Sequence, residues 1–144
     1  MSKEIYQAWT AAGTLYALVR RPADNYVWDP SIATPAFVAW VDGNIANYDI
    51  AMTATGRVHL VDFPVLIVAA GTYDVFIMLQ AGAGPAITDS FISQGQICWD
   101  GTAEIILSTI DTNVDSLITA RGIINNVSVQ TETDIELTKS RIYI

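Results

Sequence analysis

A period-two alternation of apolar and polar residues constrains this chain more than any other feature of its sequence. In residues 14–20 the alternation places Leu15, Ala17 and Val19 on one face of an extended segment. A pleated strand with one buried face requires this period, because successive side chains point to opposite sides. The pattern recurs between residues 14 and 109, and the clearest runs are 14–20, 57–63, 72–80, 90–99 and 103–109.

The alternation also predicts which side chains share a face within a strand. In residues 57–63, we expect His59, Val61 and Phe63 to lie together. Residues 72–80 and 90–99 give two further sets: Tyr73, Val75, Ile77 and Leu79 in the first, and Phe91, Ser93, Gly95, Ile97 and Trp99 in the second.

Turn residues separate the runs and indicate how the strands connect. Asp42-Gly43 and Asp100-Gly101 favour hairpins, because glycine tolerates the positive φ of a type I′ turn. Thr55-Gly56 marks another turn. Short strands at this spacing are typical of an antiparallel sandwich or barrel. We expect an all-β fold, an antiparallel immunoglobulin-like β-sandwich of seven or eight strands that begin near residues 14, 26, 36, 47, 57, 72, 90 and 102.

The pattern divides the chain into three parts: an N-terminal arm (1–13), a β-sandwich domain (14–109) and a C-terminal oligomerisation arm (110–144). In the C-terminal arm, Asp111 begins a predicted short helix that ends at Gly122. The period-two alternation then returns at Val127 and predicts one long strand, or two strands with a break near Thr131.

The apolar residues of both arms are the predicted contacts with neighbouring subunits. Only 15% of the chain is charged, whereas about a quarter is usual, so part of the surface is expected to face other chains. The aromatic residues before the first run anchor the N-terminal arm on its own sandwich or on a neighbour. The predicted contact residues are Tyr6, Trp9, Val114, Leu117, Ile118, Ile124, Val127, Val129, Ile135, Leu137, Ile142 and Ile144.

Composition argues against several partners. The net charge of −8 and the pI near 4.2 oppose nucleic-acid binding, which needs a basic stripe facing the phosphates. The longest apolar run, residues 65–71, is much shorter than the ~20 residues of a membrane-spanning helix. We therefore expect neither a nucleic-acid nor a membrane partner, and the N-terminus has no apolar run of the signal-peptide type.

The sequence offers few groups for catalysis. His59 is the single histidine and Cys98 the single cysteine, and neither has nearby ligands that would form a metal site. We therefore expect no enzyme activity, no metal and no cofactor. Two alternatives stay open: carboxylates paired in space for hydrolysis, and a carbohydrate-binding face with exposed tryptophans such as Trp28 and Trp40.

Six segments resemble a small β module of virion proteins from tailed bacteriophages. The N-terminal half is also similar to the sandwich at the N-terminus of baseplate upper proteins. The resemblance covers about residues 14–107 and rests on residues 15–21, 26–28, 40–50 (Trp-Val-Asp-Gly-Asn-Ile-Ala-Asn-Tyr-Asp-Ile), 62–64, 71–75 and 99–104. It implies a structural virion part without catalytic residues. Such modules often continue into a long stem, whereas this sequence ends at Ile144, which favours a small decoration, adaptor or connector protein.

The expected function is therefore that of a non-enzymatic bacteriophage virion protein. It would assemble as a homo-oligomer, preferably a trimer, through its terminal arms, and would bind other virion proteins. Its location would be the virion, assembled in the host cytoplasm. The alternative is a receptor-binding or carbohydrate-binding β-sandwich module of a phage tail or baseplate.

Overall fold

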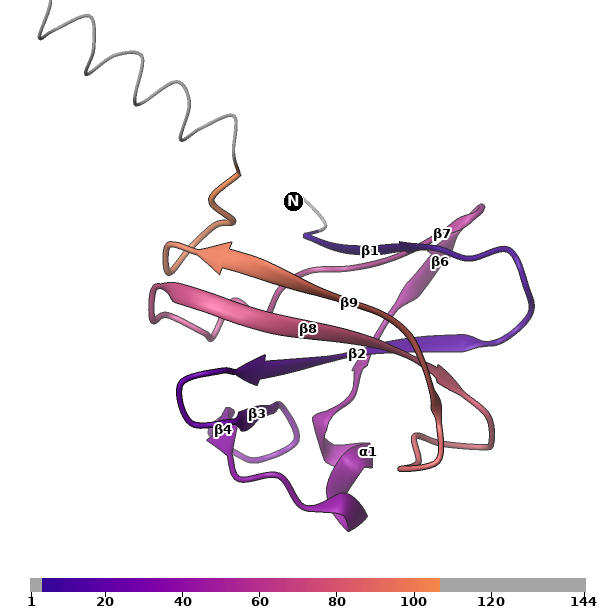
Figure 1. Cartoon of the computed structure of the whole chain (residues 1–144), viewed down its shortest axis with the longest axis horizontal. Coiled ribbons are helices and arrows are strands. Elements are labelled where there is room, and N and C mark those ends of the chain that lie inside the picture. Colours follow the sequence, from indigo (N-terminus) through magenta and orange to yellow (C-terminus); the bar gives the residue numbers. More distant parts are fainter. Residues whose placement is uncertain (1–3, 107–144) are drawn as a thin grey trace, which may run out of the picture. The chain divides into compact units, whose positions relative to one another are not determined.

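The computed structural model describes residues 4–106, which form a mostly β structure with two antiparallel sheets and one short α-helix (Figure 1). The all-β prediction is confirmed at this level. In chain order the elements are β1 (Ile5–Ala8), β2 (Thr14–Arg21), β3 (Tyr26–Asp29), β4 (Ala36–Val38), the 3₁₀ helix η1 (Asp42–Asn44), α1 (Ile45–Tyr48), β5 (Ile50–Ala51), β6 (Thr53–Thr55), β7 (Val58–Val61), β8 (Gly71–Gln80) and β9 (Ser90–Trp99).

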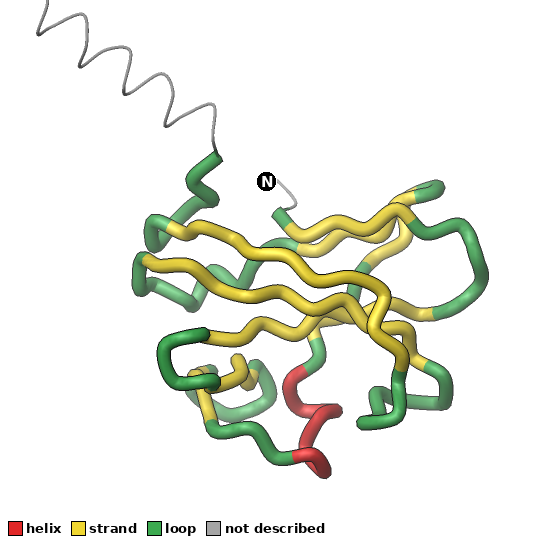
Figure 2. Tube along the Cα trace, viewed as in Figure 1, coloured by secondary structure: helices red, strands yellow, loops and turns green. Residues whose placement is uncertain are grey.

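The two sheets differ in size (Figure 2). One has three strands in the order β1-β7-β6, and the other has six, in the order β4-β3-β2-β8-β9 with β5 paired to β2. Within the described residues, β1 ends the smaller sheet and β9 ends the larger one. Residues 5–8 of the predicted N-terminal arm thus form a strand that pairs with β7 of the same chain.

The main core brings residues of both sheets together. Leu15, Ala17 and Val19 of β2 are fully buried there, as the alternation predicted. Phe63, which follows β7, and Ile5 of β1 belong to the same cluster. The small sheet therefore packs against one face of the larger sheet, and apolar burial of about 25 cal/mol per Å² stabilises the contact.

The opposite face of β2 is also buried. Tyr16 and Leu18 lie in a second apolar cluster with Met78 of β8, and the helical segment supplies Ile45 and Tyr48. Figure 2 shows this segment on the side of the larger sheet away from β1 and β7. A strand that is buried on both faces has a continuous run of apolar residues. Residues 15–19 of β2 are such a run.

The strand predicted to begin near residue 47 begins later and is only two residues long, β5, because α1 occupies Ile45–Tyr48. The predicted hairpin at Asp42-Gly43 is wrong. Asp42–Asn44 is a 3₁₀ helix, and α1 follows directly. Ile45 and Tyr48 are spaced by three residues, so a helical turn buries both against the sheet, whereas period two would place them on opposite faces. The Trp40 Nε1 group also donates to Asp42 Oδ1 at 2.6 Å, which holds the start of this turn.

The predicted face of Phe91 is wrong because β9 contains a bulge. Ile77 pairs with Ser93 but Met78 pairs with Phe91, so Ile92 is an extra residue in β9. The extra residue reverses the alternation on its N-terminal side. Phe91 therefore lies on the face opposite Ile97, with its ring edge-on to Phe76 at a centroid distance of 5.9 Å.

The other turn predictions have mixed outcomes. Thr55-Gly56 connects β6 to β7, and Gly56 has a φ of 63°. After Asp100-Gly101 the chain returns antiparallel to β9, and the described part of the expected strand near residue 102 forms one bridge, between Trp99 and Glu104. The predicted helix, the alternating segment from Val127 and the boundary at residue 110 lie outside the described residues.

A buried carboxylate holds the loop between β8 and β9. Asp89 accepts hydrogen bonds from the backbone N–H groups of Ala81 (3.0 Å) and Ala86 (2.8 Å) and from the Tyr16 hydroxyl (2.8 Å). Burial opposes ionisation of Asp89, but these bonds outweigh it and lower its pKa. Burial and the bond to Asp89 raise the pKa of Tyr16. The ionised Asp89 and neutral Tyr16 pair therefore fixes both ends of the loop.

Replacing this carboxylate should destabilise the protein in a pH-dependent way. We expect Asp89→Asn to lower the free energy of unfolding at pH 7 by about 1–3 kcal/mol, because buried partners lose a charge-assisted bond. The folded pKa lies below the ordinary value of 3.8, so the stabilisation is present above that value and is lost as pH falls through the folded pKa. Urea unfolding at several pH values would measure this.

The exposed ion pair of Arg21 and Asp24 provides the matched control. Asp24→Asn removes a hydrogen-bonded carboxylate at the surface and should change the stability less. An Asp89→Asn variant as stable as the wild type at pH 7 would contradict the role assigned to Asp89.

Candidate assembly surfaces

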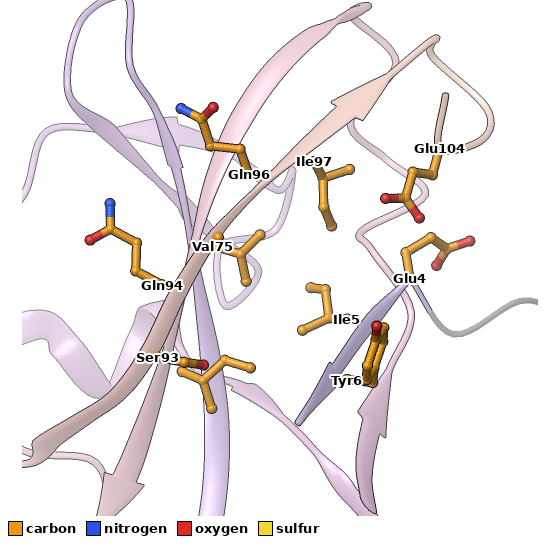
Figure 3. A pocket seen from close by; sticks show the side chains of 11 residues that line it. Glu4, Ile5, Tyr6, Val75, Ser93, Gln94, Gln96, Ile97 and Glu104 are labelled. Atoms are coloured by element: carbon orange, nitrogen blue, oxygen red, sulfur yellow. The ribbon is translucent and has the colours of Figure 1, made fainter. Parts of the chain in front are cut away.

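A groove of about 300 Å³ lies between β1 and β9, the strands that end the two sheets (Figure 3). We call it the edge groove. Its apolar side chains come from both sheets, with Ile5 on one side and Val75 and Ile97 on the other, whereas Gln94 and Gln96 point away from them. The lining residues include Glu4, Ile5, Tyr6, Val75, Ser93, Ile97 and Glu104.

Among the described residues, β9 has a partner strand, β8, on one side only. The Ile105 N–H donates to the Cys98 carbonyl at 2.7 Å, so Cys98 directs its backbone groups to the open side of β9. The direction of the backbone N–H and C=O groups alternates along a strand. The backbone groups of Gln96 and Gln94 therefore point to the same side of β9 as those of Cys98. The segment after Gly101 pairs with only one end of β9 in the described residues, and unpaired backbone groups of this kind accept another strand.

Polar contacts fix the geometry of the edge groove. Glu4 Oε2 accepts a hydrogen bond from the Phe63 N–H at 3.0 Å, and the Ser93 hydroxyl donates to Gln7 Oε1 at 2.5 Å. The second bond joins β1 to β9 across the two sheets. The two edges are therefore held at a fixed separation.

A second depression lies on the face of the larger sheet that α1 partly covers. We call it the aromatic hollow; its volume is about 300 Å³ and its lining is Leu18, Arg20, Asn25, Val27, Trp40, Phe76 and Phe91. Phe91 is 69% exposed and Trp40 is 39% exposed. Large exposed apolar groups of this kind, gathered around a concavity, mark interaction sites.

The charges beside the aromatic hollow neutralise each other. Arg20 donates through Nε and Nη2 to Asp74, and its Nη1 donates to Asn25 Oδ1 at 3.0 Å. Gln96 Nε2 donates to the other oxygen of Asp74 at 3.0 Å. Burial opposes ionisation of Asp74, but the hydrogen bonds from Arg20 and Gln96 outweigh it and lower the pKa of Asp74. This end of the hollow is thus an internal ion pair.

A third surface is the loop of residues 64–70, which we call the aliphatic loop. Val65, Leu66 and Val68 are exposed on it. Two strands anchor the backbone of this loop. Trp99 Nε1 of β9 donates to the Ile67 carbonyl, and the Tyr73 hydroxyl of β8 donates to the Ala69 carbonyl, both at 2.8 Å. The aliphatic side chains therefore project from a fixed backbone.

A further depression of about 440 Å³ lies beside the aliphatic loop and contains two carboxylates, Asp49 and Asp62. Burial raises the pKa of Asp49. Its other lining is mainly apolar and includes Trp28 and three prolines. Among the described residues, no group of three or more His, Cys, Asp or Glu side chains is placed to hold a metal ion.

The two predicted contact residues of the N-terminal arm, Tyr6 and Trp9, lie in different environments. Tyr6 is 69% exposed and lines the edge groove, whereas Trp9 packs against the main core, where its Nε1 has no hydrogen-bond partner. The other predicted contacts are beyond residue 106, outside the described part: Val114, Leu117, Ile118, Ile124, Val127, Val129, Ile135, Leu137, Ile142 and Ile144.

Sequence reasoning missed the aromatic hollow. It treated Trp28 and Trp40 alike, but Trp28 is buried in the core and Trp40 is partly exposed. His59 is buried, with 8% of its surface exposed, and Phe63 and Val61, which the alternation places on the same face, belong to or pack against the main core. Cys98 is exposed. The hollow could not be found from a regular alternation, because the bulge at Ile92 brings Phe91 to this face.

No protein-family model matches this chain, and no curated protein or solved structure is similar enough to count as a match. In the part of the chain that the structure describes, no helix has the length and apolar character needed to cross a membrane.

Gly101 ties the aliphatic loop to the turn after β9, and replacing it should destabilise both. Gly101 has a φ of 107°, and an added Cβ would lie 2.8 Å from the Val68 carbonyl oxygen. We expect Gly101→Ala to lower the free energy of unfolding by about 1–3 kcal/mol, measured by urea unfolding. Gly43→Ala is the control, because a Cβ there meets nothing within 4 Å; equal effects of both variants would contradict this account.

Proposed function

We propose that this protein is a non-enzymatic structural component of a bacteriophage virion, a small decoration, adaptor or connector protein. Copies assemble into a homo-oligomer, preferably a trimer, through the terminal arms, and the oligomer binds other virion proteins. The virion is its location, after assembly in the host cytoplasm. The observation that carries the assembly part of this proposal is the edge groove, where, within residues 4–106, the two sheets end side by side and β9 has a partner strand, β8, on one side only.

The finer form of the fold belongs to the same proposal. We infer that the two sheets form an immunoglobulin-like antiparallel β-sandwich. The shared core of Ile5, Phe63 and the β2 residues supports it, because the two sheets bury their inner faces against each other. The six segments that resemble a virion module lie largely in these strands and turns.

The proposed assembly mechanism is strand addition. The alternating segment from Val127 carries an apolar face with Val129, Ile135 and Leu137. An extended segment from a neighbouring copy can pair with the open side of β9 and place apolar side chains beside Ile5 and Ile97. Backbone hydrogen bonds give the register, and burial of the apolar face gives the stability.

The acidic composition favours specific apolar contacts over general attraction. Residues 4–106 contain three arginines and ten aspartates and glutamates, a net charge of −7. Like charge repels copies that meet in the wrong orientation. Assembly therefore depends on surfaces where apolar burial outweighs this repulsion, and the edge groove is one of them.

Receptor or carbohydrate binding remains the alternative, but the exposed aromatic residues support it less well. Trp28 is buried and cannot stack on a sugar. Trp40 is accessible, yet its Nε1 is bonded to Asp42 and its neighbours Leu18, Val27 and Phe76 are apolar. Sugar hydroxyls would find few partners there, because a glycan site needs free donors and acceptors beside the ring.

Substitutions in the C-terminal arm should dissociate the oligomer. We expect the wild type to have the mass of a trimer of 15.6 kDa chains, or of a whole-number multiple of that trimer, and the double variant Ile135→Asp, Leu137→Asp to have a lower mass, because two charges replace apolar contacts. Light scattering coupled to size-exclusion chromatography would measure this. A matched double variant, Glu132→Gln and Glu136→Gln, changes the opposite face of the same segment and should retain the wild-type mass. A wild type that is a monomer at micromolar concentration would contradict the proposal.

A proline on the open side of β9 should block assembly while the fold is kept. Gln94 directs its N–H to the open side, so Gln94→Pro removes a group that the β8 ladder does not use. Gly95 directs its N–H towards β8, and Gly95→Pro should instead destabilise the domain. Thermal unfolding and light scattering of both variants separate the two effects; a Gln94→Pro variant that is folded and fully assembled would exclude strand addition at this position.

A further inference from the structure

We propose that the aromatic hollow is a two-fold docking site for a second copy of this chain, in which each Phe91 ring enters the hollow of the other copy. This inference rests on the proposed function, because it adds a second interface to an oligomer that the arms assemble. It assigns a role to Phe91, the most exposed aromatic side chain in the strands of the larger sheet, which neither the core nor the edge groove uses.

The chemistry of the hollow selects an apolar occupant. Each of the three guanidinium nitrogens of Arg20 already donates to Asp74 or Asn25. The Trp40 Nε1 donates to Asp42. The remaining lining consists of aliphatic and aromatic side chains from β2, β3, β8 and β9. A charged or strongly polar ligand would lose its hydrogen bonds to water and gain few hydrogen bonds in the hollow, whereas an apolar side chain has no such bonds to lose.

The charge distribution favours a second copy at this place. The described residues carry a net charge of −7, so most pairs of surfaces on two copies repel each other. At the hollow, the charge of Arg20 is balanced by Asp74, with a separation of 2.5 Å. Like-charge repulsion is therefore small where the two apolar surfaces would meet.

The shape of the site is complementary to itself. Phe91 contributes to the lining of the hollow and is also 69% exposed, so one patch contains both an exposed ring and a concavity. A two-fold interface requires a patch that matches itself. Phe76 contacts the Phe91 ring edge-on at a centroid distance of 5.9 Å, which favours one orientation of the exposed ring.

This interface would double the oligomer that the arms form. Three copies joined by the arms carry three hollows, and a two-fold contact between two such trimers generates a hexamer with dihedral symmetry. Several weak contacts acting together raise the effective concentration of each. A small contact of one ring per copy is then sufficient.

The test uses the full chain with a charge introduced at Phe91. We expect Phe91→Asp to halve the mass of the oligomer in sedimentation velocity, under reducing conditions that exclude disulfides through Cys98. The control is Ile87→Asp, which places the same charge at an apolar residue that is 54% exposed and lies outside the candidate surfaces, and it should leave the mass unchanged. Phe91→Tyr keeps the ring and should restore the wild-type mass.

The outcomes separate this inference from the proposed function. A Phe91→Asp variant with the wild-type mass overturns the inference, whatever the arms do. If Ile135→Asp, Leu137→Asp leaves the mass unchanged, the arm-based function fails, and a monomeric Phe91→Asp variant then identifies the hollow as the whole interface. Raising the salt concentration gives a further check: an apolar contact keeps or gains strength, and dissociation at high salt would contradict it.

Discussion

The rest of the structure depends on the burial of β2 on both of its faces. One face contributes Leu15, Ala17 and Val19 to the core between the sheets, and the other holds Tyr16 and Leu18 under the helical segment. β2 also pairs with β3, β5 and β8. It therefore links the small sheet, the helical segment and the long β8–β9 pair, and a polar substitution in its centre would affect all three.

Buried side chains near the ends of the strands hold two of the loops in place. Asp89 holds the β8–β9 loop through two backbone N–H groups and reaches Tyr16 of β2. Trp99 holds the aliphatic loop through the Ile67 carbonyl. Loops with such anchors keep their shape, because each buried polar group has a specific partner. The exposed apolar side chains on the anchored aliphatic loop are thus presented in a defined arrangement.

Open sheet edges link the fold to the proposed assembly. Isolated edge strands tend to pair with other chains unless charge, a bulge or a covering segment prevents it. β9 has a bulge at Ile92 and a backbone partner at Cys98, so within residues 4–106 the stretch between them is the part of its outer side without a partner. This restriction would allow pairing in one place and one register, which suits a structural protein that must assemble in a defined way.

The sequence by itself determined the β architecture, the positions of most strands and the inner faces of β2, β7 and β8. It did so because period-two alternation is a local signal that burial on one face imposes directly. Only the tertiary structure decided the face of Phe91, the helix at Ile45–Tyr48 and the approach of β1 to β9. A bulge, a helical turn packed on a sheet and the meeting of two edges each depend on contacts between residues far apart in the chain. The candidate surfaces arise from these contacts, and for that reason the pattern of residues could not reveal them.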